Sequence, residues 1–446
     1  MTTNIDQSKI NLSMQSTMSQ AIDNVKAKGA DQVEMMAKND KGFSVTARLG
    51  DVETVEHHNQ RSIAVTVYCG KAKGSARTND ISPQSIHKAM DAALNIASFT
   101  ADDEFSGLAD KALMAYEYPD LQLEHGWEID TEQALQLAIE CERVARDDKR
   151  IVNSEGATVS SIRSQLSYAN SHGFFGEYNS TQHSLSCSVV AGDDQGMQRD
   201  HWYSVTRDPN QLESTKSVGT MARERTVRRL SASGLKTCQA PIIFEPPMAR
   251  SVISHLIGAL KGNAIYRQAS FMVDAINKKI LPEWVSIKED PHVLGGLASA
   301  PFDNEGVRTQ SRHIVENGVL QAYVLDSYSA RKLGMQTTAN AGGVHNIRMT
   351  DRGRSLDDLI KDMGKGLLVT ELIGHGVNTV TGDYSRGASG FWIEQGIIQY
   401  PVQEITIAGN LTSMLENIAE IGSDVDIRSN IQCGSILIEG MTIAGS

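Results

Sequence analysis

Residues 43–49, Phe-Ser-Val-Thr-Ala-Arg-Leu, alternate apolar and polar side chains, and residues 63–67 repeat the alternation. A period of two is typical of strands that bury one face and expose the other, as in an antiparallel sheet. Helical spacing of apolar residues brackets these strands, at 13–28 before them and at 83–97 after them. The first 100 residues are therefore predicted to form an antiparallel sheet with flanking helices.

The remainder of the chain divides into two stretches of different texture. Residues 130–235 again carry helical spacing, then strand-like alternation, then helical spacing, whereas residues 236–446 are Gly-rich and β-branched. We predict an α+β protein in which residues 1–235 form antiparallel sheets with helices, either as one domain or as two halves, 1–100 and 130–235. Residues 236–446 are predicted to form a mostly β domain with a few helices.

Two segments of the C-terminal region are predicted hairpins. Residues 314–320 carry Asn317-Gly318 between apolar runs, and residues 392–398 carry Gln395-Gly396 in the same place. Such pairs suit tight turns that need a positive φ. The likeness fits either chance similarity of common hairpins or an internal repeat.

The composition limits the classes of function. A formal net charge of -12 over 446 residues repels a phosphate backbone, so no direct nucleic-acid binding is expected. The five cysteines lie far apart without a C-x-x-C pair, which indicates reduced thiols. The N-terminus lacks the pattern of a signal peptide, and no apolar run approaches the 18 or so residues of a membrane span. We expect a cytoplasmic protein that does not associate with membranes.

Local catalytic motifs are absent from the sequence. None of the twelve histidines is followed by Glu, so the H-E-x-x-H zinc helix does not occur. A G-x-S-x-G elbow, a P-loop and a G-x-G-x-x-G loop are missing as well. No catalytic residue is therefore assigned. Cys433 and His255 are the candidates for metal ligands, and a structural role is the alternative for each.

The segment 374–390 is the strongest candidate for a binding site, because five glycines flank polar residues in it. Its candidate peptide-binding or chamber-lining residues are Asp383, Tyr384, Ser385 and Arg386, and His345 lies in a similar loop. A guanidinium such as that of Arg386 can bind a carboxylate through two hydrogen bonds. The alternative is a long connection whose glycines serve turn geometry and whose Asp383–Arg386 pair is structural.

Three stretches carry a resemblance to a known family. Residues 297–309, 382–387 and 429–435 resemble the TldE (PmbA) subunits of the TldD/TldE metalloprotease family, and the likeness extends over nearly the whole chain. The resemblance implies a cytosolic complex with a TldD-like paralogue that trims or degrades unfolded peptides. It also implies links to peptide-antibiotic maturation, to antitoxin turnover and, by name, to modulation of DNA gyrase.

The resemblance places the zinc in the partner. TldD-type chains carry a helix with His-Glu and a second His four residues after the Glu, and a distant Cys is the third ligand. In this sequence Ser254, His255 and Ala259 stand at the three helix positions, and Cys433 alone matches. One thiolate cannot hold catalytic zinc, which takes about three protein ligands. The resemblance thus implies a non-catalytic subunit without a cofactor of its own.

Two other hypotheses stay open at this point. The chain could be a hydrolase with a dispersed site, such as Cys433 with His345 or His375, so its enzymatic status is undecided. Alternatively, it could be a regulatory module that binds DNA gyrase as a protein. An isolated chain is also expected to form a homodimer through the surface meant for its paralogue.

Overall fold

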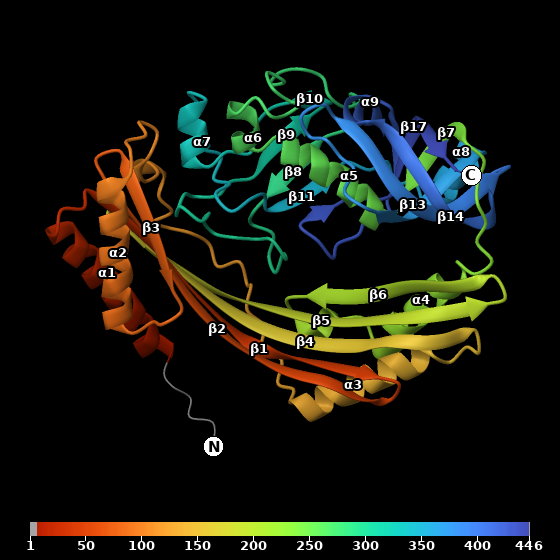
Figure 1. Cartoon of the computed structure of the whole chain (residues 1–446), viewed down its shortest axis with the longest axis horizontal. Coiled ribbons are helices and arrows are strands. Elements are labelled where there is room, and N and C mark those ends of the chain that lie inside the picture. Colours follow the sequence, from red (N-terminus) through yellow and green to blue (C-terminus); the bar gives the residue numbers. More distant parts are fainter. Residues whose placement is uncertain (1–6, 446) are drawn as a thin grey trace.

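The computed structural model describes residues 7–445, with side chains from Met14 onward. Figure 1 shows two blocks: a long curved sheet from the N-terminal half, and a β-rich body from the C-terminal half above it. The residues 1–6, part of the stretch in which no signal peptide is predicted, lie outside the described residues. None of the described helices combines the length and apolar character needed to cross a membrane.

The N-terminal block is built on one six-stranded antiparallel sheet. Its strand order is β3-β2-β1-β4-β5-β6, so the pairing of β1 with β4 joins the first half of the region to the second. The strands are β1 (Gln32–Arg48), β2 (Asp51–Cys69), β3 (Ala72–Thr78), β4 (Ile151–Asn170), β5 (Phe175–Asp193) and β6 (Gly196–Thr206). The chain between the halves is irregular apart from a short turn of helix, Lys111–Leu113.

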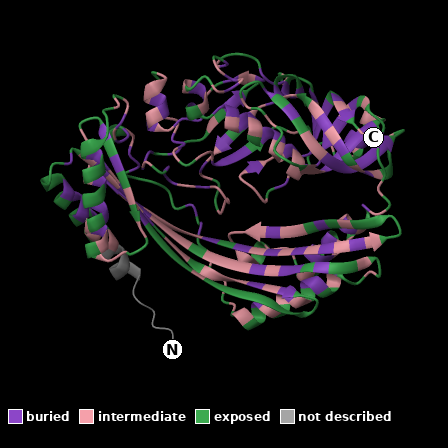
Figure 2. Cartoon of the chain, in the orientation of Figure 1, coloured by how far each residue is buried: buried purple, intermediate pink, exposed green. Residues whose placement is uncertain are grey.

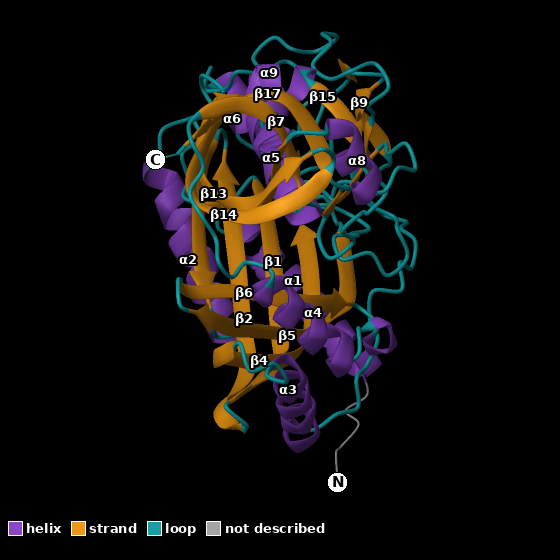
Figure 3. Cartoon of the chain, turned by 90° about the vertical axis from the view of Figure 1, so that its right-hand side faces the viewer, coloured by secondary structure: helices purple, strands orange, loops and turns teal. Residues whose placement is uncertain are grey.

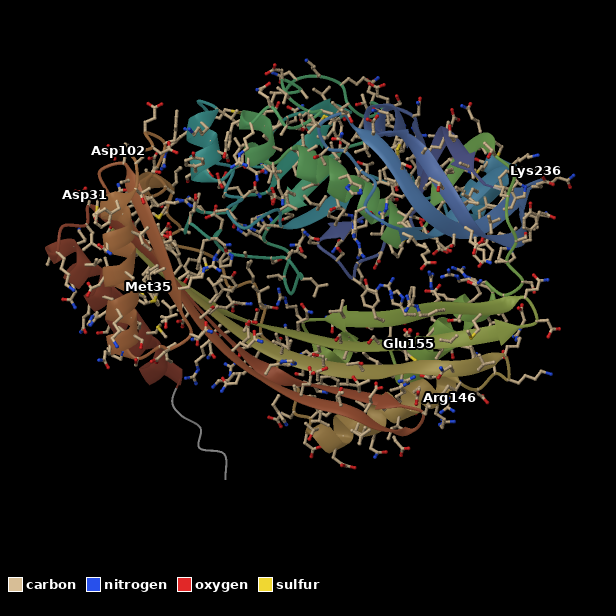
Figure 4. All side chains as sticks on the ribbon, viewed as in Figure 1. Asp31, Met35, Asp102, Arg146, Glu155 and Lys236 are labelled. Carbon is tan, nitrogen blue, oxygen red and sulfur yellow. The ribbon has the colours of Figure 1, made fainter. Side chains whose placement is uncertain are left out.

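Helices cover one face of this sheet. Helices α1 (Gln7–Ala27) and α2 (Pro83–Phe99) pack near one end, against Met35 and its neighbours, where Figure 4 labels Met35. Helices α3 (Thr131–Ala145) and α4 (Thr215–Val227) pack near the other end, around Val45. Met35 and Val45 are an even number of residues apart along β1, so their side chains point to the same face of the sheet. Both helix pairs therefore cover that face.

The opposite face of the sheet meets the C-terminal block. Tyr168 and Phe174 pack there against Phe302 and Val307, which belong to a loop of the C-terminal half. The Phe174 and Phe302 rings meet edge to face, with centroids 5.6 Å apart. This aromatic cluster fixes the C-terminal loops on the sheet.

A group of buried carboxyls lies beside that aromatic cluster. The hydroxyls of Tyr68 and Tyr168 donate hydrogen bonds of 2.9 and 2.8 Å to the two carboxylate oxygens of Glu34. On the C-terminal side, Asp303 accepts the backbone N–H groups of Glu305 and Val307 at 2.9 and 3.0 Å. The junction of the two blocks is therefore polar as well as aromatic.

The C-terminal block contains a closed barrel. Its strand order is β14-β13-β12-β7-β17-β15, and an additional pairing of β14 with β17 closes the ring seen in Figure 3. Strands β7 and β12 are parallel, whereas the other barrel pairs are antiparallel. The strands are β7 (Cys238–Phe244), β12 (Gly366–Ile373), β13 (Asp383–Glu394), β14 (Ile397–Asn410), β15 (Ile418–Ile421) and β17 (Ile436–Ala444).

A second, five-stranded sheet stands beside the barrel in the order β10-β9-β8-β11-β16. Its short strands are β8 (Ile287–Asp290), β9 (Arg312–Glu316), β10 (Val319–Leu320), β11 (Asn346–Met349) and β16 (Ile431–Gln432). The accompanying helices are α5 (Pro246–Ala259), α6 (Gly262–Tyr266), α7 (Ser327–Lys332), α8 (Leu356–Met363) and α9 (Leu411–Glu416). Figure 2 shows buried residues in both blocks, and the largest buried apolar cluster lies in this one.

Both predicted hairpins are confirmed. Asn317 and Gly318 have φ of 49° and 78°, and Gln395 and Gly396 have φ of 54° and 70°. The first hairpin joins β9 to β10 and the second joins β13 to β14, so the two belong to different sheets. The internal repeat stays a prediction.

The predicted α+β class is confirmed, with antiparallel sheets and flanking helices followed by a mainly β region with few helices. The division into domains 1–235 and 236–446 stays a prediction. Lys236, labelled in Figure 4, lies where the chain passes from one block to the other. The β1–β4 pairing favours treating residues 1–235 as one unit rather than two.

Candidate functional site

Helix α5 lies at the centre of the C-terminal core. It packs on β7 and β12, and the side chains of Val252, Leu256 and Ala259 are fully buried. A helix that is apolar on most sides is typical of the interior of a domain. Ser251 and His255 interrupt this apolar surface four residues apart, which places them on one face of the helix.

Strand β13 presents two polar side chains to that face. Tyr384 and Arg386 are two residues apart and therefore point to the same side of the strand. Arg386 Nη1 donates a hydrogen bond of 3.0 Å to Ser251 Oγ, and the Tyr384 ring meets the His255 ring edge to face at 6.1 Å. These four side chains are named here the α5–β13 cluster.

The α5–β13 cluster holds polar atoms without partners. His255 Nε2, the Tyr384 hydroxyl and Arg386 Nε are all enclosed, and none forms a hydrogen bond within the described part of the chain. A buried polar group without a hydrogen bond costs roughly 1–3 kcal/mol, so native proteins rarely retain one without a reason. Three at one place indicate a site that is built to receive a ligand or a bridging molecule.

The charges of the cluster follow from its burial. Burial lowers the pKa of His255, and the positive charge of Arg386 lowers it further, so the ring is neutral at neutral pH. Burial raises the pKa of Tyr384 to about 12, against the opposing effect of the Arg386 charge. Arg386 forms no ion pair with any of the side chains that the structure describes, from Met14 onward. The cluster thus carries one positive charge without a counter-charge.

The other predicted residues of this segment lie outside the cluster. Asp383 accepts a hydrogen bond of 2.5 Å from Thr381 Oγ1, and the Ser385 side chain is exposed. The expected Asp383–Arg386 pair is not formed, because residues three apart on a strand point to opposite faces. Peptide binding by Asp383 and Ser385 stays a prediction.

His345 belongs to a different, structural network. Its backbone N–H and its Nδ1 lie 2.8 and 3.0 Å from Glu289 Oε1, and Arg312 Nε donates to Glu289 Oε2 at 2.8 Å. Burial alone would raise the pKa of Glu289, but the His345 hydrogen bond and the Arg312 charge outweigh it and leave the pKa at about 2. His345 is therefore a partner of a buried carboxylate, and a role in lining a chamber stays a prediction.

The zinc-ligand positions do not fit a zinc ion. Ser254 is exposed and Ala259 has no donor atom, while Cys433 is buried with Sγ 4.0 Å from the Pro246 carbonyl oxygen. Burial, aided by the negative charge of Asp426, raises the pKa of Cys433 to about 12, whereas zinc binds the thiolate. From Met14 to Gly445, where side chains are described, no three His, Cys, Asp or Glu side chains are grouped to hold a metal.

The alternative dispersed site is not assembled either. Within the described residues the Cys433 thiol lies near Pro246, Asp426 and Arg250, whereas His345 is bonded to Glu289. His375 lies on an exposed loop before β13. The missed member of the site is Ser251, which could have been found from its spacing of four residues to His255.

Comparisons with known proteins define the class of this fold. Three successive models of the PmbA/TldA metallopeptidase family match the chain: domain 1 at residues 36–97, the central domain at 124–230 and the C-terminal domain at 237–445. The chain therefore belongs to the PmbA/TldA metallopeptidase family.

Particular relatives cover almost the whole chain. Metalloprotease PmbA of Escherichia coli O157:H7 is 47% identical over 417 residues, which are 93% of this chain and 93% of that protein. A crystal structure from Bacteroides thetaiotaomicron, described as a modulator of DNA gyrase, superposes with a TM-score of 0.91 at 26% identity and covers 97% of this chain and 99% of that one. TldE from Thermococcus kodakarensis has a TM-score of 0.82 at 20% identity, over 96% of this chain and all of that one, which shows the shared fold.

Proposed function

We propose that this chain is the non-catalytic, TldE/PmbA-type subunit of a zinc metalloprotease complex, and that it holds unfolded peptide for a TldD-like paralogue that carries the zinc. The family membership supports the paralogue as the partner, since TldD and TldE are members of one family. In this proposal the chain contributes binding and positioning, whereas water activation belongs to the paralogue.

The observation that carries the proposal is the donor set of helix α5. Zinc in a peptidase needs about three protein ligands and a nearby base to deprotonate its water. Ser254, His255 and Ala259 provide neither, and the fourth position, Cys433, is a protonated, buried thiol. Helix α5 therefore corresponds to the zinc-binding helix of TldD-type chains but lacks its metal ligands and its general base.

Space for an extended peptide lies between the two blocks. A cavity of about 390 Å³ is bordered by Trp202 and Thr206 of β6 and by Pro246 at the start of α5. A second cavity, of about 560 Å³, is bordered by Leu123, Tyr178 and Pro301. Because β6 is the outer strand of its sheet, a peptide strand can add to it through backbone hydrogen bonds.

The test combines metal analysis with a mixing assay. The purified chain alone is expected to contain less than one zinc per molecule and to leave unfolded peptides intact. Addition of the TldD-like paralogue is expected to start cleavage, and the rate should saturate at a fixed ratio of the two chains. Proteolysis by the chain alone that a chelator abolishes would overturn the proposal.

Cys433→Ala is expected to leave cleavage by the mixed complex within about twofold of the unchanged complex, because the thiol is not a ligand. The measurement is the initial rate of peptide cleavage together with the zinc content of the complex. Cys187→Ala, which removes another buried thiol in the N-terminal block, is the matched control for loss of packing. Loss of zinc and activity in Cys433→Ala alone would mean that this residue does bind the metal.

A further inference from the structure

We propose that the α5–β13 cluster, with Arg386 at its centre, binds a carboxylate group of the peptide ligand. The inference rests on the proposed peptide-binding function and adds the chemical group that the site recognises. Its basis is the convergence of Ser251 and His255 from α5 with Tyr384 and Arg386 from β13.

The charge balance of the cluster favours an anion. A guanidinium has five N–H donors and no acceptor, and it is charged at every physiological pH. Among the side chains described, from Met14 onward, Arg386 donates to Ser251, and its guanidinium also lies near the Tyr384 hydroxyl, where it opposes the rise in the pKa of Tyr384. A partly buried cation without a counter-charge stabilises an incoming carboxylate and repels a metal ion.

The unpartnered atoms have the donor character that a carboxylate needs. The Tyr384 hydroxyl and Arg386 Nε are donors, and neutral His255 donates through Nε2 in one of its two tautomers. Tyr384 is 1% exposed and its hydroxyl has no other hydrogen-bond partner in the described chain. These three donors belong to neighbouring side chains of α5 and β13, and the two oxygens of a carboxylate have the lone pairs to accept from them.

Access to the cluster runs along its half-buried side chains. His255 and Arg386 are partly exposed, and the neighbouring Ser254 and Ser385 are exposed, so the cluster adjoins the surface. The unpartnered atoms themselves are enclosed, so a carboxylate enters by rotation of a half-exposed side chain, that of Arg386 or that of His255. Arg386 donates one hydrogen bond of 3.0 Å to the uncharged Ser251 hydroxyl, and a carboxylate is a stronger acceptor for the same guanidinium.

The test measures binding of unstructured, fluorescently labelled peptides to the full chain and to the mixed complex. Each peptide is made as a free acid, as a C-terminal amide, and with its Glu and Asp residues replaced by Gln and Asn. Removing the recognised carboxylate is expected to weaken binding about ten- to a hundredfold, as for loss of a hydrogen-bonded charge. The two modified forms show whether that carboxylate is the C-terminus or an acidic side chain.

The variants test the protein side of the same contact. Arg386→Lys is expected to weaken binding of the free acid about tenfold or more, and to leave binding of the form without the carboxylate unchanged. Tyr384→Phe is expected to have a smaller effect in the same direction. Arg348→Lys and Tyr400→Phe, which alter more exposed residues of the same two types in the C-terminal block, are the matched controls.

The outcomes separate this inference from the proposed function. Equal binding of all peptide forms would refute the carboxylate site and leave the peptide-binding function standing. Failure of every peptide to bind the chain and the complex would refute both. Acetate is expected to compete with the free acid where acetamide does not. Equal competition by the two would assign the cluster a structural role with bridging water. Because the peptide forms need no mutation, a variant that unfolds does not decide the result.

Discussion

Replacing Glu305 with Gln should make the stability of the chain less dependent on pH. Between about pH 5 and about pH 8 the unchanged chain should lose about 3 kcal/mol of stability through Glu305, and the Gln variant should not. Burial raises the pKa of Glu305 from 4.5 to about 8, and the negative charge of Asp303 adds to the shift. A raised pKa means that the folded chain holds the proton more tightly than the unfolded chain. The stabilising contribution is therefore complete below pH 4.5 and is lost as the pH rises through about 8.

The measurement is the thermal or denaturant midpoint of both chains at each end of this pH range. Asp303, whose pKa burial raises to about 6, leaves a smaller pH dependence in the Glu305→Gln chain. Glu439→Gln alters an exposed carboxyl of the same block and should keep the full pH dependence. An unchanged pH dependence in Glu305→Gln would show that this carboxyl is ionised in the folded chain.

Glu245→Ala should destabilise the chain by about 3–5 kcal/mol, the usual effect of removing one partner from a buried ion pair. Glu245 precedes α5 and accepts hydrogen bonds from Arg225 at 3.1 Å and from Arg228 at 2.8 Å. The side chains of Glu245 and Arg225 are 6% and 12% exposed, so the buried guanidinium would keep only Asp200, 3.3 Å away, as its counter-charge. Since Arg225 belongs to α4, this network also ties the two blocks together.

Denaturant unfolding measures this effect, and the two blocks are expected to lose their common transition. Asp91→Ala is the control, because Asp91 and Lys28 form an exposed ion pair, in which both side chains are 52% exposed. Exposed pairs contribute little, so this change should leave the midpoint almost unmoved. If the midpoint of Glu245→Ala were as close to that of the unchanged chain as the midpoint of Asp91→Ala is, water would be replacing the carboxylate as the hydrogen-bond partner of the arginines.

Local patterns in the sequence predicted the elements well, because their signals lie within a few residues. The alternation of residues 43–47 is confirmed in β1, whereas the extension to Leu49 is wrong, because Leu49 has a φ of 55° and is exposed in the turn after the strand. Ser355 and Asp358 form a capping box at the start of α8, a pattern that spans only a few residues. In each case the physical cause, side-chain alternation or a capping hydrogen bond, acts over one or two turns of chain.

The barrel and the α5–β13 cluster depend on distant pairings that leave no local pattern. The parallel pairing of β7 with β12 joins segments more than a hundred residues apart, and it sets α5 beside β13. The sequence therefore indicated His255 only as a single histidine on a helix, and Tyr384 and Arg386 only as candidate residues of a Gly-rich segment. Their meeting could not be predicted. The alternation along the strand could have predicted that Asp383 and Ser385 point away from the cluster.

The position of β17 at the far end of the sequence governs when the barrel can form during synthesis. β17 bonds to β7, β14 and β15, all of which are translated before it. Roughly 200 residues separate β7 from the end of β17, so β7 waits about 10 to 40 s for its last neighbour at usual bacterial elongation rates. The six strands of the N-terminal sheet are all complete before β7 is made. That sheet can therefore fold on the ribosome, whereas the barrel strands stay open until late and need protection from premature association in the meantime.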